Sequence, residues 1–424
     1  MNKFISSLLW KIKNKEVLKV YDEIKKYENN FEVLANKKLK DILKHAKENV
    51  PFYKDIDVES IDINNLSSLP IVTKDTIRNQ FDSLVSKKKP YEYWKNTSGG
   101  STGEPVRFLQ DKNYQTWVDA TLYYYYKDLL GVDWSASKKL VIWGSVEDFE
   151  KRTTFKSKIK NYLSNIKFIN AFNFGEKEKL NTIKEINNFK PDILKAYANS
   201  LVDLATYIEE HNIEVYSPEI IVTSTAMLYK EHRELIEKSF KTKVFDFYGS
   251  REASALAAED KNNSEKKIFL FNNIIEVVNN RILVTNLHNF VMPLIRFDIL
   301  DSAVSLEKVD DSYFLNGLNG RVFEYLTGNK ENKIHAQYFI TLFFYIDEIK
   351  HYNLIQKDIN TIEILYTLNE NKILFSDKQN EVNEKIYNAL DMKPNIIWKE
   401  VSEIPKTKSG KYIYVRSEIK EEKN

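Results

Sequence analysis

The sequence predicts an α/β protein whose large N-terminal part contains a mainly parallel sheet covered by helices on both faces. Between residues 139 and 250, short runs rich in β-branched and aromatic side chains alternate with runs of helical periodicity. Such alternation is typical of parallel strands joined by crossover helices. The 424 residues, of which 42% are hydrophobic, are enough for more than one domain with a packed core.

The first part of the chain reads mostly as helix. Residues 16 to 50 place apolar side chains three and four positions apart, and Pro51 should end that run at or before Val50. A short helix is expected after Thr73, which can cap it. For residues 3 to 13 we expect a helix docked on the domain, with a helix lying on a membrane surface as the alternative.

The alternating region can be assigned element by element. Strands are expected at residues 139–145, 167–174, 192–198, 219–225 and 243–250, and helices at 178–189, 200–212 and 229–240. In sheets of this kind ligands bind at the carboxyl ends of the strands. The ends of the runs 219–225 and 243–250 are therefore candidate places for a site.

From residue 268 the sequence indicates a β-rich subdomain with a hairpin turn at Asn279-Asn280. Past Arg321 it reads as a small α+β unit. That unit should contain a hairpin at 361–376 with its turn near 369–371, a helix at 380–391 and a last strand at 396–401. The polar, glycine-containing stretch 320–334 marks the border, so we expect domains at 1–322 and 323–424.

Composition excludes several classes of function. Lysine and arginine number 63 against 61 acidic residues, so net charge gives no argument for nucleic-acid binding. The absence of cysteine excludes disulfides, thiolate chemistry and cysteine-bound zinc. No run approaches the ~20 apolar residues of a membrane span, and no signal peptide is recognised. We therefore expect a cytoplasmic location.

A glycine-rich stretch, "NTSGGSTGEPV" at residues 96–106, is the first candidate site. Glycines let backbone N–H groups approach phosphate oxygens, and the hydroxyls of Ser98, Ser101 and Thr102 add donors. The Gly-Lys-Ser/Thr of a Walker A loop is missing. On this stretch alone a Gly/Ser-rich turn or linker is the favoured interpretation.

"YGSRE" at residues 248–252 is the second candidate. A glycine after a strand could turn the chain and direct Glu252 towards a metal–phosphate ligand, because Mg²⁺ usually takes only one or two protein carboxylates. The alternative is a strand–turn–helix junction capped by Ser250.

Two further charged residues are candidates near the ends of their domains. Asp301, after "PLIRFDIL", could accept hydrogen bonds from a ribose diol, with a surface ion pair as the alternative. Lys411, in "PKTKSGK", could present a positive charge to a phosphate, with a solvated basic turn as the alternative.

Taken together and in order, these segments resemble the adenylate-forming superfamily of acyl- and aryl-CoA synthetases. The chain is most similar to the phenylacetate–CoA ligase branch and, within it, to the CapK-type proteins named for capsular polysaccharide biosynthesis. "TSGGSTGEP" looks like the phosphate loop of that branch, and "YGSRE" and "LHN…MPLIRF" are its more specific features. The resemblance extends over most of the chain.

The resemblance implies that ATP and Mg²⁺ activate a carboxylic acid as an acyl-adenylate, with release of pyrophosphate. The acyl group then passes to CoA or, alternatively, to an amine on a sugar or amino acid. A non-catalytic, nucleotide-binding member is an alternative of another class. The family also suggests a homodimer.

The resemblance also implies a role for each matching residue. The phosphates would be bound by Ser98, Gly99, Gly100, Ser101, Thr102 and Gly103, and the nucleotide by Asp246, Tyr248, Gly249, Ser250, Asp301 and Arg321. Glu252, with Thr102, would hold the metal. Glu252 and Lys411 would be catalytic, with Lys411 carried in by closure of the small domain.

The sequence departs from the family pattern at several positions. Leu300 replaces the glycine that usually precedes the ribose aspartate, and Ala226 replaces a glutamate. Phe323 and Glu324 replace paired aspartates at the hinge. Some relatives have a Cys/His cluster where this chain has residues 260–267, so no structural metal is expected.

The acyl pocket is assigned only in outline. Tyr123 to Tyr126, Trp143 and the segments around Tyr197 could line it. Packing in the core is the alternative for such a tyrosine-rich helix.

Overall fold

The computed structural model describes most of the chain. The described residues are 3–90, 92–98, 106–143, 161–170, 176–225, 228, 230–318, 325–329, 332–343, 346, 348–369, 372–404 and 414–419, without the side chains of Asn199, His335, Gln337 and Thr341. All statements below concern these residues.

Helices form the first part of the chain, as predicted. They are α1 (Lys3–Lys13), α2 (Lys15–Lys26), α3 (Phe31–Asn49), η1 (Pro51–Tyr53), α4 (Lys74–Asn79) and α5 (Phe81–Leu84). The predicted run 16–50 is interrupted once, where the Asn30 side chain accepts a hydrogen bond from the Val33 N–H and starts α3. Val50 is extended before Pro51, and Thr73 caps α4 with a capping box.

A nine-stranded sheet forms the centre of the molecule, in the order β13-β14-β9-β8-β7-β6-β5-β3-β4. Its parallel part consists of β3 (Lys139–Trp143), β4 (Ile166–Asn170), β5 (Ile193–Tyr197), β6 (Ile220–Ser224) and β7 (Val244–Ser250). Its antiparallel part consists of β8 (Ser254–Ala258), β9 (Lys266–Ile268), β13 (Ser305–Val309) and β14 (Ser312–Asn316). β7 is the strand where the two parts meet.

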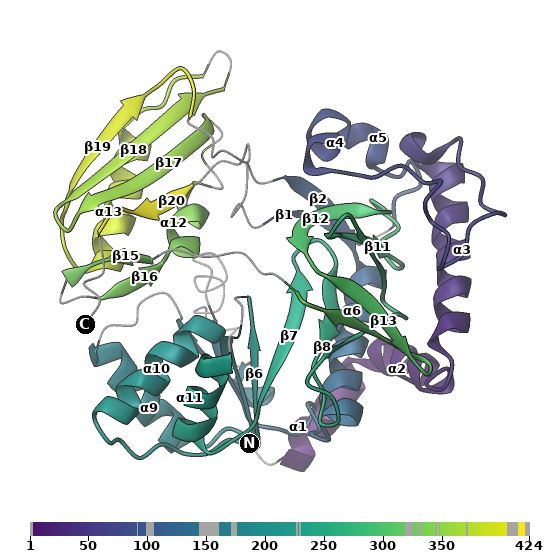
Figure 1. Cartoon of the computed structure of the whole chain (residues 1–424), viewed down its shortest axis with the longest axis horizontal. Coiled ribbons are helices and arrows are strands. Elements are labelled where there is room, and N and C mark those ends of the chain that lie inside the picture. Colours follow the sequence, from purple (N-terminus) through teal and green to yellow (C-terminus); the bar gives the residue numbers. More distant parts are fainter. Residues whose placement is uncertain are drawn as a thin grey trace.

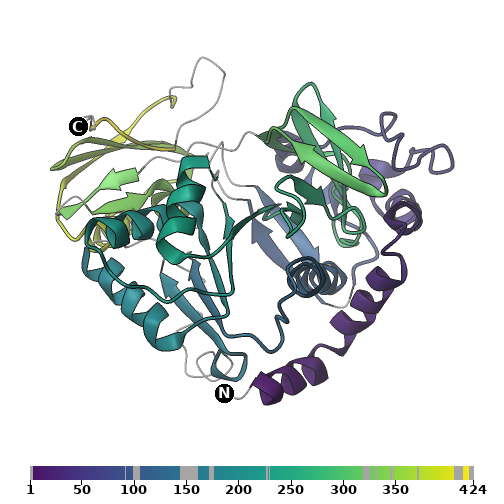
Figure 2. The same cartoon turned by 60° about the horizontal axis from the view of Figure 1, so that its bottom comes forward.

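Helices cover both faces of the parallel part. One face packs against α9 (Glu176–Phe189), α10 (Ala198–Glu210) and α11 (Lys230–Phe240), using alternate residues such as Leu194 and Ile221. The other face uses Ile193, Val222 and Phe245, and packs against α6 (Lys112–Tyr124) and its π-helical end η2 (Tyr125–Leu129). In Figure 2 the teal helices lie on one side of the sheet and the blue helix α6 on the other. The alternation follows from the two-residue period of a strand.

Two smaller sheets complete the N-terminal part. The hairpin of β1 (Tyr93–Thr97) and β2 (Arg107–Asp111) leads into α6. A three-stranded antiparallel sheet contains β10 (Asn273–Val278), β11 (Arg281–Asn286) and β12 (Phe297–Ser302). The predicted turn at Asn279-Asn280 is confirmed, with positive φ values of 51° and 61° as a two-residue hairpin turn requires. β1, β2 and β12 lie near the upper end of β7 in Figure 1.

The C-terminal part has its own sheets and its own hydrophobic core. Its elements are β15 (Tyr325–Thr327), β16 (Lys333–His335), α12 (Ala336–Leu342), β17 (Ile349–Asp358), β18 (Thr361–Leu368), α13 (Ser376–Leu390), β19 (Asn395–Glu400) and β20 (Val415–Ser417). Four strands pair in the order β19-β18-β17-β20, and buried residues from Leu326 to Val415 form one separate cluster.

The predicted hairpin at 361–376 is wrong. β18 pairs with the preceding strand β17, through a tight turn at Ile359 and Asn360, and the chain after residue 372 leads directly into α13. The polar residues around Asn369 end a strand rather than reverse the chain between two strands.

The fold class predicted from the sequence is confirmed. A large α/β part with helices on both faces of its parallel strands is followed by a small α+β part, which lies beyond α10 in Figure 1. The domain border at residue 322 stays a prediction, because residues 319–324 lie outside the described part. Within the described residues, no helix combines the length and apolar character that a bilayer crossing requires.

Candidate functional site

The glycine-rich stretch is the connection of a closed hairpin. The Ser98 N–H donates to the Val106 carbonyl oxygen at 2.9 Å, and the Val106 N–H donates back to the Ser98 hydroxyl at 2.9 Å. Both ends of the loop therefore meet at one buried point, which fits a structured turn, and phosphate binding by the loop stays a prediction. Residues Gly99 to Gly103, including Thr102, lie outside the described part of the chain.

The "YGSRE" segment forms a strand–turn–strand between β7 and β8. A Cβ added at Gly249 would lie 2.4 Å from the Ser254 carbonyl oxygen, so only glycine fits this close approach. The Ser250 hydroxyl accepts a hydrogen bond from the Ala253 N–H at 3.0 Å and closes the turn. Because β8 follows instead of a helix, the strand–turn–helix alternative is wrong.

The "YGSRE" turn lies beside the base of the glycine loop. The Gln110 side-chain amide donates to the Arg251 carbonyl oxygen at 2.8 Å and to the Glu252 carbonyl oxygen at 3.4 Å. Gln110 is also held by Asn96, which donates to its side-chain oxygen at 2.9 Å. Glu252 itself is buried. Two motifs about 150 residues apart in the chain are thus brought together by β2.

Asp301 joins the same region through Tyr248. The Tyr248 hydroxyl donates to the Asp301 Oδ2 at 2.9 Å, linking β7 of the large sheet to β12 of the small one. The predicted nucleotide residues Tyr248, Gly249, Ser250 and Asp301 and the predicted metal ligand Glu252 therefore share one area. Lys411 and Arg321 lie outside the described residues, so their roles stay predictions.

Leu300, at the position where the family pattern has glycine, adopts a backbone conformation that glycine favours. Its φ is +66°, in the left-handed region that glycine favours, and its N–H donates to Asp298 Oδ1 at 2.9 Å. Asp298 is buried and paired with Arg281. These contacts hold the left-handed residue within an irregularity of strand β12, directly before Asp301.

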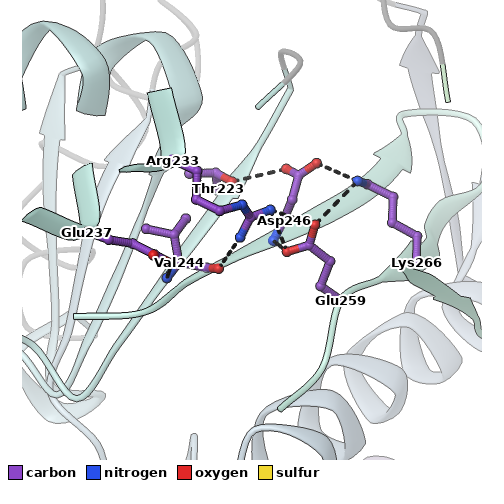
Figure 3. Close-up of polar contacts among 7 residues, drawn as sticks. All are labelled: Thr223, Arg233, Glu237, Val244, Asp246, Glu259 and Lys266. Carbon is purple, nitrogen blue, oxygen red and sulfur yellow. Dashed lines mark hydrogen bonds and ion pairs between the residues drawn. The ribbon is translucent and has the colours of Figure 1, made fainter. Parts of the chain in front are cut away.

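Asp246 is part of a buried network of charges (Figure 3). Its Oδ1 accepts a hydrogen bond from the Thr223 hydroxyl at 3.0 Å, and its Oδ2 lies 2.8 Å from the Lys266 Nζ. Its N–H donates to Glu259 at 2.9 Å. Both carboxylate oxygens therefore have partners inside the protein, which favours a supporting role below the nucleotide residues of the same strand.

Arg233 completes this network from α11. Its Nη2 donates to both carboxylate oxygens of Glu259, at 2.7 and 2.8 Å, and its Nη1 donates to the Val244 carbonyl oxygen at 2.5 Å (Figure 3). Burial raises the pKa of Glu259 even though Arg233 and Lys266 lower it. The network ties β7 to its neighbours on both sides and to a covering helix.

Asp111, which sequence reasoning missed, connects the hairpin to the small sheet. One oxygen accepts the Tyr114 N–H at 2.8 Å and caps α6, while the other accepts the N–H groups of Phe290 and Val291 at 2.7 and 3.0 Å. Asn289 adds a hydrogen bond from its amide to the Leu109 carbonyl oxygen at 2.8 Å. The position of Asp111 before a helical run indicates a helix cap. Nothing in the sequence indicates its contacts with Phe290 and Val291.

His288, in the same family-specific segment, has a structural role. Its ring stacks on Trp117 with centroids 3.7 Å apart, and its Nε2 lies 2.8 Å from the Phe271 carbonyl oxygen. Burial lowers the pKa of His288 to about 3. The imidazole is therefore neutral at physiological pH and supports the core.

Lys195 on β5 is a second residue that sequence reasoning missed. Its Nζ lies 5.3 Å from the ring centroids of both Trp143 and Phe247, while Val141 and Val222 flank it on the adjacent strands. Within the described residues it has no hydrogen bond or ion pair. Burial lowers the pKa of Lys195 to about 8. A lone lysine in an apolar strand was the only signal for it in the sequence.

The aromatic residues considered for the acyl pocket form two groups. Tyr123 to Tyr126 are all buried in the main core, where Tyr125 lies 5.4 Å from the Phe247 ring. These residues therefore pack in the core, as the alternative reading predicted. Trp143 and Tyr197 lie together, with ring centroids 4.4 Å apart, at the carboxyl ends of β3 and β5. This second pair remains in a position to contact a ligand.

Comparison with solved structures identifies the fold as that of a carboxylate–CoA ligase. The crystal structure of 2-hydroxyisobutyryl-CoA ligase in complex with 2-HIB-AMP and CoA, in the thioesterification state, matches with a TM-score of 0.55. It is 12% identical, with 91% of this chain and 89% of that chain covered. The open conformation of the same ligase matches with a TM-score of 0.52 and 12% identity, covering 89% and 90%. At this identity the similarity establishes the fold.

Comparison of sequences shows similarity to the CapK proteins. Residues 326–418 match the CapK C-terminal domain family. The chain is 26% identical to Protein CapK of Staphylococcus aureus over 432 residues, with 94% of this chain and 92% of that protein covered. The chain is therefore similar to Protein CapK over most of its length and has the fold of a carboxylate–CoA ligase, which agrees with the CapK-type resemblance drawn from its motifs.

Leu300→Gly should leave the free energy of unfolding within about 1 kcal/mol of wild type. Relief of left-handed strain, about 1–2 kcal/mol, offsets the lost packing and the greater backbone entropy of glycine. Leu300→Val should cost more than about 1 kcal/mol, because a β-branched residue fits this backbone worst. Urea unfolding measures both variants. Equal losses for glycine and valine would contradict the strain account.

Arg233→Met should destabilise the protein by about 3–5 kcal/mol, because it leaves the buried Glu259 carboxylate without its main partner. Adding Glu259→Gln to that variant should recover part of the loss. Denaturant unfolding gives the comparison. The control is Lys385→Met, which breaks an exposed pair with Glu381 and should cost less than about 0.5 kcal/mol. A small effect of Arg233→Met would show that the network does not stabilise β7.

Lys195→Met should stabilise the protein at pH 7 by about 1–3 kcal/mol, since it removes a desolvated cation. The folded pKa of about 8 lies below the unfolded value of 10.5, so the penalty is complete below pH 8. The advantage of the variant should then shrink as the pH rises from 8 towards 10.5. Thermal unfolding of both proteins across this range tests it, and a difference independent of pH would contradict it.

Proposed function

We propose that this protein is an ATP-dependent ligase that activates a carboxylic acid as an acyl-adenylate and releases pyrophosphate. The observation that carries the proposal is the Tyr248–Asp301 hydrogen bond beside a turn that abuts the base of the glycine loop. Tyr248, Asp301, Glu252 and Ser98 at the base of the loop lie together near the carboxyl end of β7, and we infer that such groups bind ribose, metal and phosphates there. The fold shared with a ligase whose crystal structures contain 2-HIB-AMP and CoA supports it.

The residues divide the work between binding and chemistry. Asp301, oriented by Tyr248, would accept hydrogen bonds from the ribose hydroxyls, and the loop from Ser98 to Gly103 would donate backbone N–H groups to the phosphates. Lys411 would bring a positive charge to the reacting carboxylate and the α-phosphate, where negative charge develops in the transition state. Arg321 would accompany the ribose at the domain junction.

Mg²⁺ fits the acidic group at this site. Glu252 is buried at the turn, next to the strand that carries the glycine loop, so a cation with phosphates would compensate its charge. Among the described residues no cluster of three or more potential ligands forms a complete cage. Glu252, with Thr102, would therefore supply the protein ligands, and Mg²⁺ would neutralise phosphate charge.

We further propose CoA as the acyl acceptor, with an amine as the alternative, and a cytoplasmic role in polysaccharide biosynthesis. The biosynthetic setting follows from the resemblance to proteins named for capsular polysaccharide biosynthesis, and the ligase structure solved with CoA supports the thiol. A purely nucleotide-binding role is less well supported. Leu300 has a left-handed backbone conformation that glycine favours, and Tyr248 donates a hydrogen bond to Asp301.

The decisive experiment is pyrophosphate release from ATP and Mg²⁺ with a panel of aryl, fatty, hydroxy and amino acids. Glu252→Gln should lower kcat/KM about 10²–10³-fold, because a charged group at the phosphates is lost. Lys411→Ala should abolish adenylation while ATP still binds. The matched control is Glu16→Gln, an exposed carboxylate on α2, which should leave the rate unchanged.

Each outcome of this experiment has a definite meaning. Acid-dependent release that requires Glu252 and Lys411 supports adenylation, and stimulation by CoA or by amines identifies the acceptor class. Wild-type activity in Lys411→Ala would contradict the mechanism. No release with any acid, from protein shown to bind ATP, would favour the binding-only alternative.

A further inference from the structure

Helix α1 turns its apolar side chains outward. An amphipathic helix on a globular protein normally buries its apolar face against the core. Here the only buried residue of α1 is Ser6. Its large apolar side chains are exposed: Phe4 at 74%, Ile5 at 47%, Leu8 at 49%, Leu9 at 42% and Ile12 at 57%.

The opposite face of α1 docks on the protein through polar groups and one ring. The Ser7 and Ser135 hydroxyls lie 2.8 Å apart, and the Ser6 hydroxyl donates to the Leu163 carbonyl oxygen at 3.4 Å. Trp10 stacks on Tyr123 with centroids 4.7 Å apart. These contacts determine the rotation of the helix about its axis. The outward direction of the apolar face therefore follows from specific bonds.

Lysines border the outward face. At about 100° per residue, the five apolar side chains cover an arc of roughly 140°, with Lys11 beyond one edge and Lys13 beyond the other. Both lysines are exposed. The first 15 residues contain no acidic side chain, since Glu16 is the first in the chain. Lys3 of the same helix is paired with Asp192, but among the described residues Lys11 and Lys13 have no ion pair, so apolar surface and unpaired positive charge occur together.

From these observations we infer that α1 binds flat on a lipid bilayer whose headgroups are anionic. The 11 residues of α1 span about 16 Å, roughly half of an apolar bilayer core, so the helix lies in the interface and does not cross it. Its apolar face would enter the acyl boundary, while Lys11 and Lys13 reach the phosphate groups. The inference is independent of the proposed ligase activity.

The charges favour a bilayer over a second copy of this chain. Two copies joined face to face through α1 would bring their lysines together, without an acidic residue on either helix to compensate them. Anionic headgroups supply that compensation. In Figure 1, α1 also lies at the lower margin of the molecule, away from the β1–β2 hairpin. Binding through α1 would leave the candidate site open to substrates.

Flotation of the full chain with two kinds of vesicle tests the inference. Wild type should bind vesicles of mixed phosphatidylglycerol and phosphatidylcholine, and bind pure phosphatidylcholine much more weakly. Phe4→Ser with Leu8→Ser should weaken binding at least tenfold, because both side chains are exposed and leave the water only on the vesicle. The matched control is Ile373→Ser with Phe375→Ser, two exposed apolar residues elsewhere, which should bind like wild type.

The lysines give an independent measurement. Lys11→Gln and Lys13→Gln should each lower the affinity for anionic vesicles about fivefold and reduce its dependence on salt. Failure of wild type to bind anionic vesicles would overturn the inference, as would an equal loss in the control variant. Self-association that disappears in Phe4→Ser with Leu8→Ser, without vesicle binding, would instead identify a second copy as the occupant. Thermal unfolding verifies that the variants are folded.

Discussion

The position of β7 is the constraint on which the candidate site depends. This strand ends the parallel part of the sheet and begins the antiparallel part, and it carries Tyr248, Gly249 and Ser250. The buried carboxylates of Asp246 and Glu259, paired with the half-buried Lys266 and Arg233, fix it from both sides. A partly satisfied network of this kind would cost several kcal/mol, because an unpaired buried charge is strongly unfavourable. The network is therefore a rigid support for Tyr248, Gly249 and Ser250, which follow Asp246 on the same strand.

The site is assembled from three sheets, so each junction has to be held separately. The Tyr248 hydroxyl links the large sheet to Asp301 of β12, and Gln110 links the hairpin to the turn after β7. Asp111 then fastens the hairpin to the segment that precedes β12. Because each bond joins segments far apart in the chain, none is a local feature. The three bonds together explain why distant motifs act as one unit.

Local chemistry could be predicted from the sequence, and tertiary partners could not. The cap at Thr73 and the turn at Asn279-Asn280 depend only on neighbouring residues, and both are confirmed. The hairpin near Asn369 is wrong, because polar residues mark a strand end equally well when the partner strand precedes it. Lys195 and the tertiary contacts of Asp111 could not be predicted, because they depend on residues that are distant in the sequence. For Lys195, these distant neighbours are the rings of Trp143 and Phe247, which only the folded chain brings next to it.

Helix α1 illustrates this limit in the opposite direction. A helix docked on the domain was the expected outcome, and α1 does contact the domain, but the sequence pattern does not say which face meets the protein. Hydroxyl contacts and the Trp10 stack decide this, and they expose the apolar face. Exposed apolar surface costs roughly 25 cal/mol per Å² of free energy in water, and this cost is removed when another apolar medium covers the helix. A helix oriented in this way is therefore best understood as one part of a two-sided contact, with the protein on one side and lipid on the other.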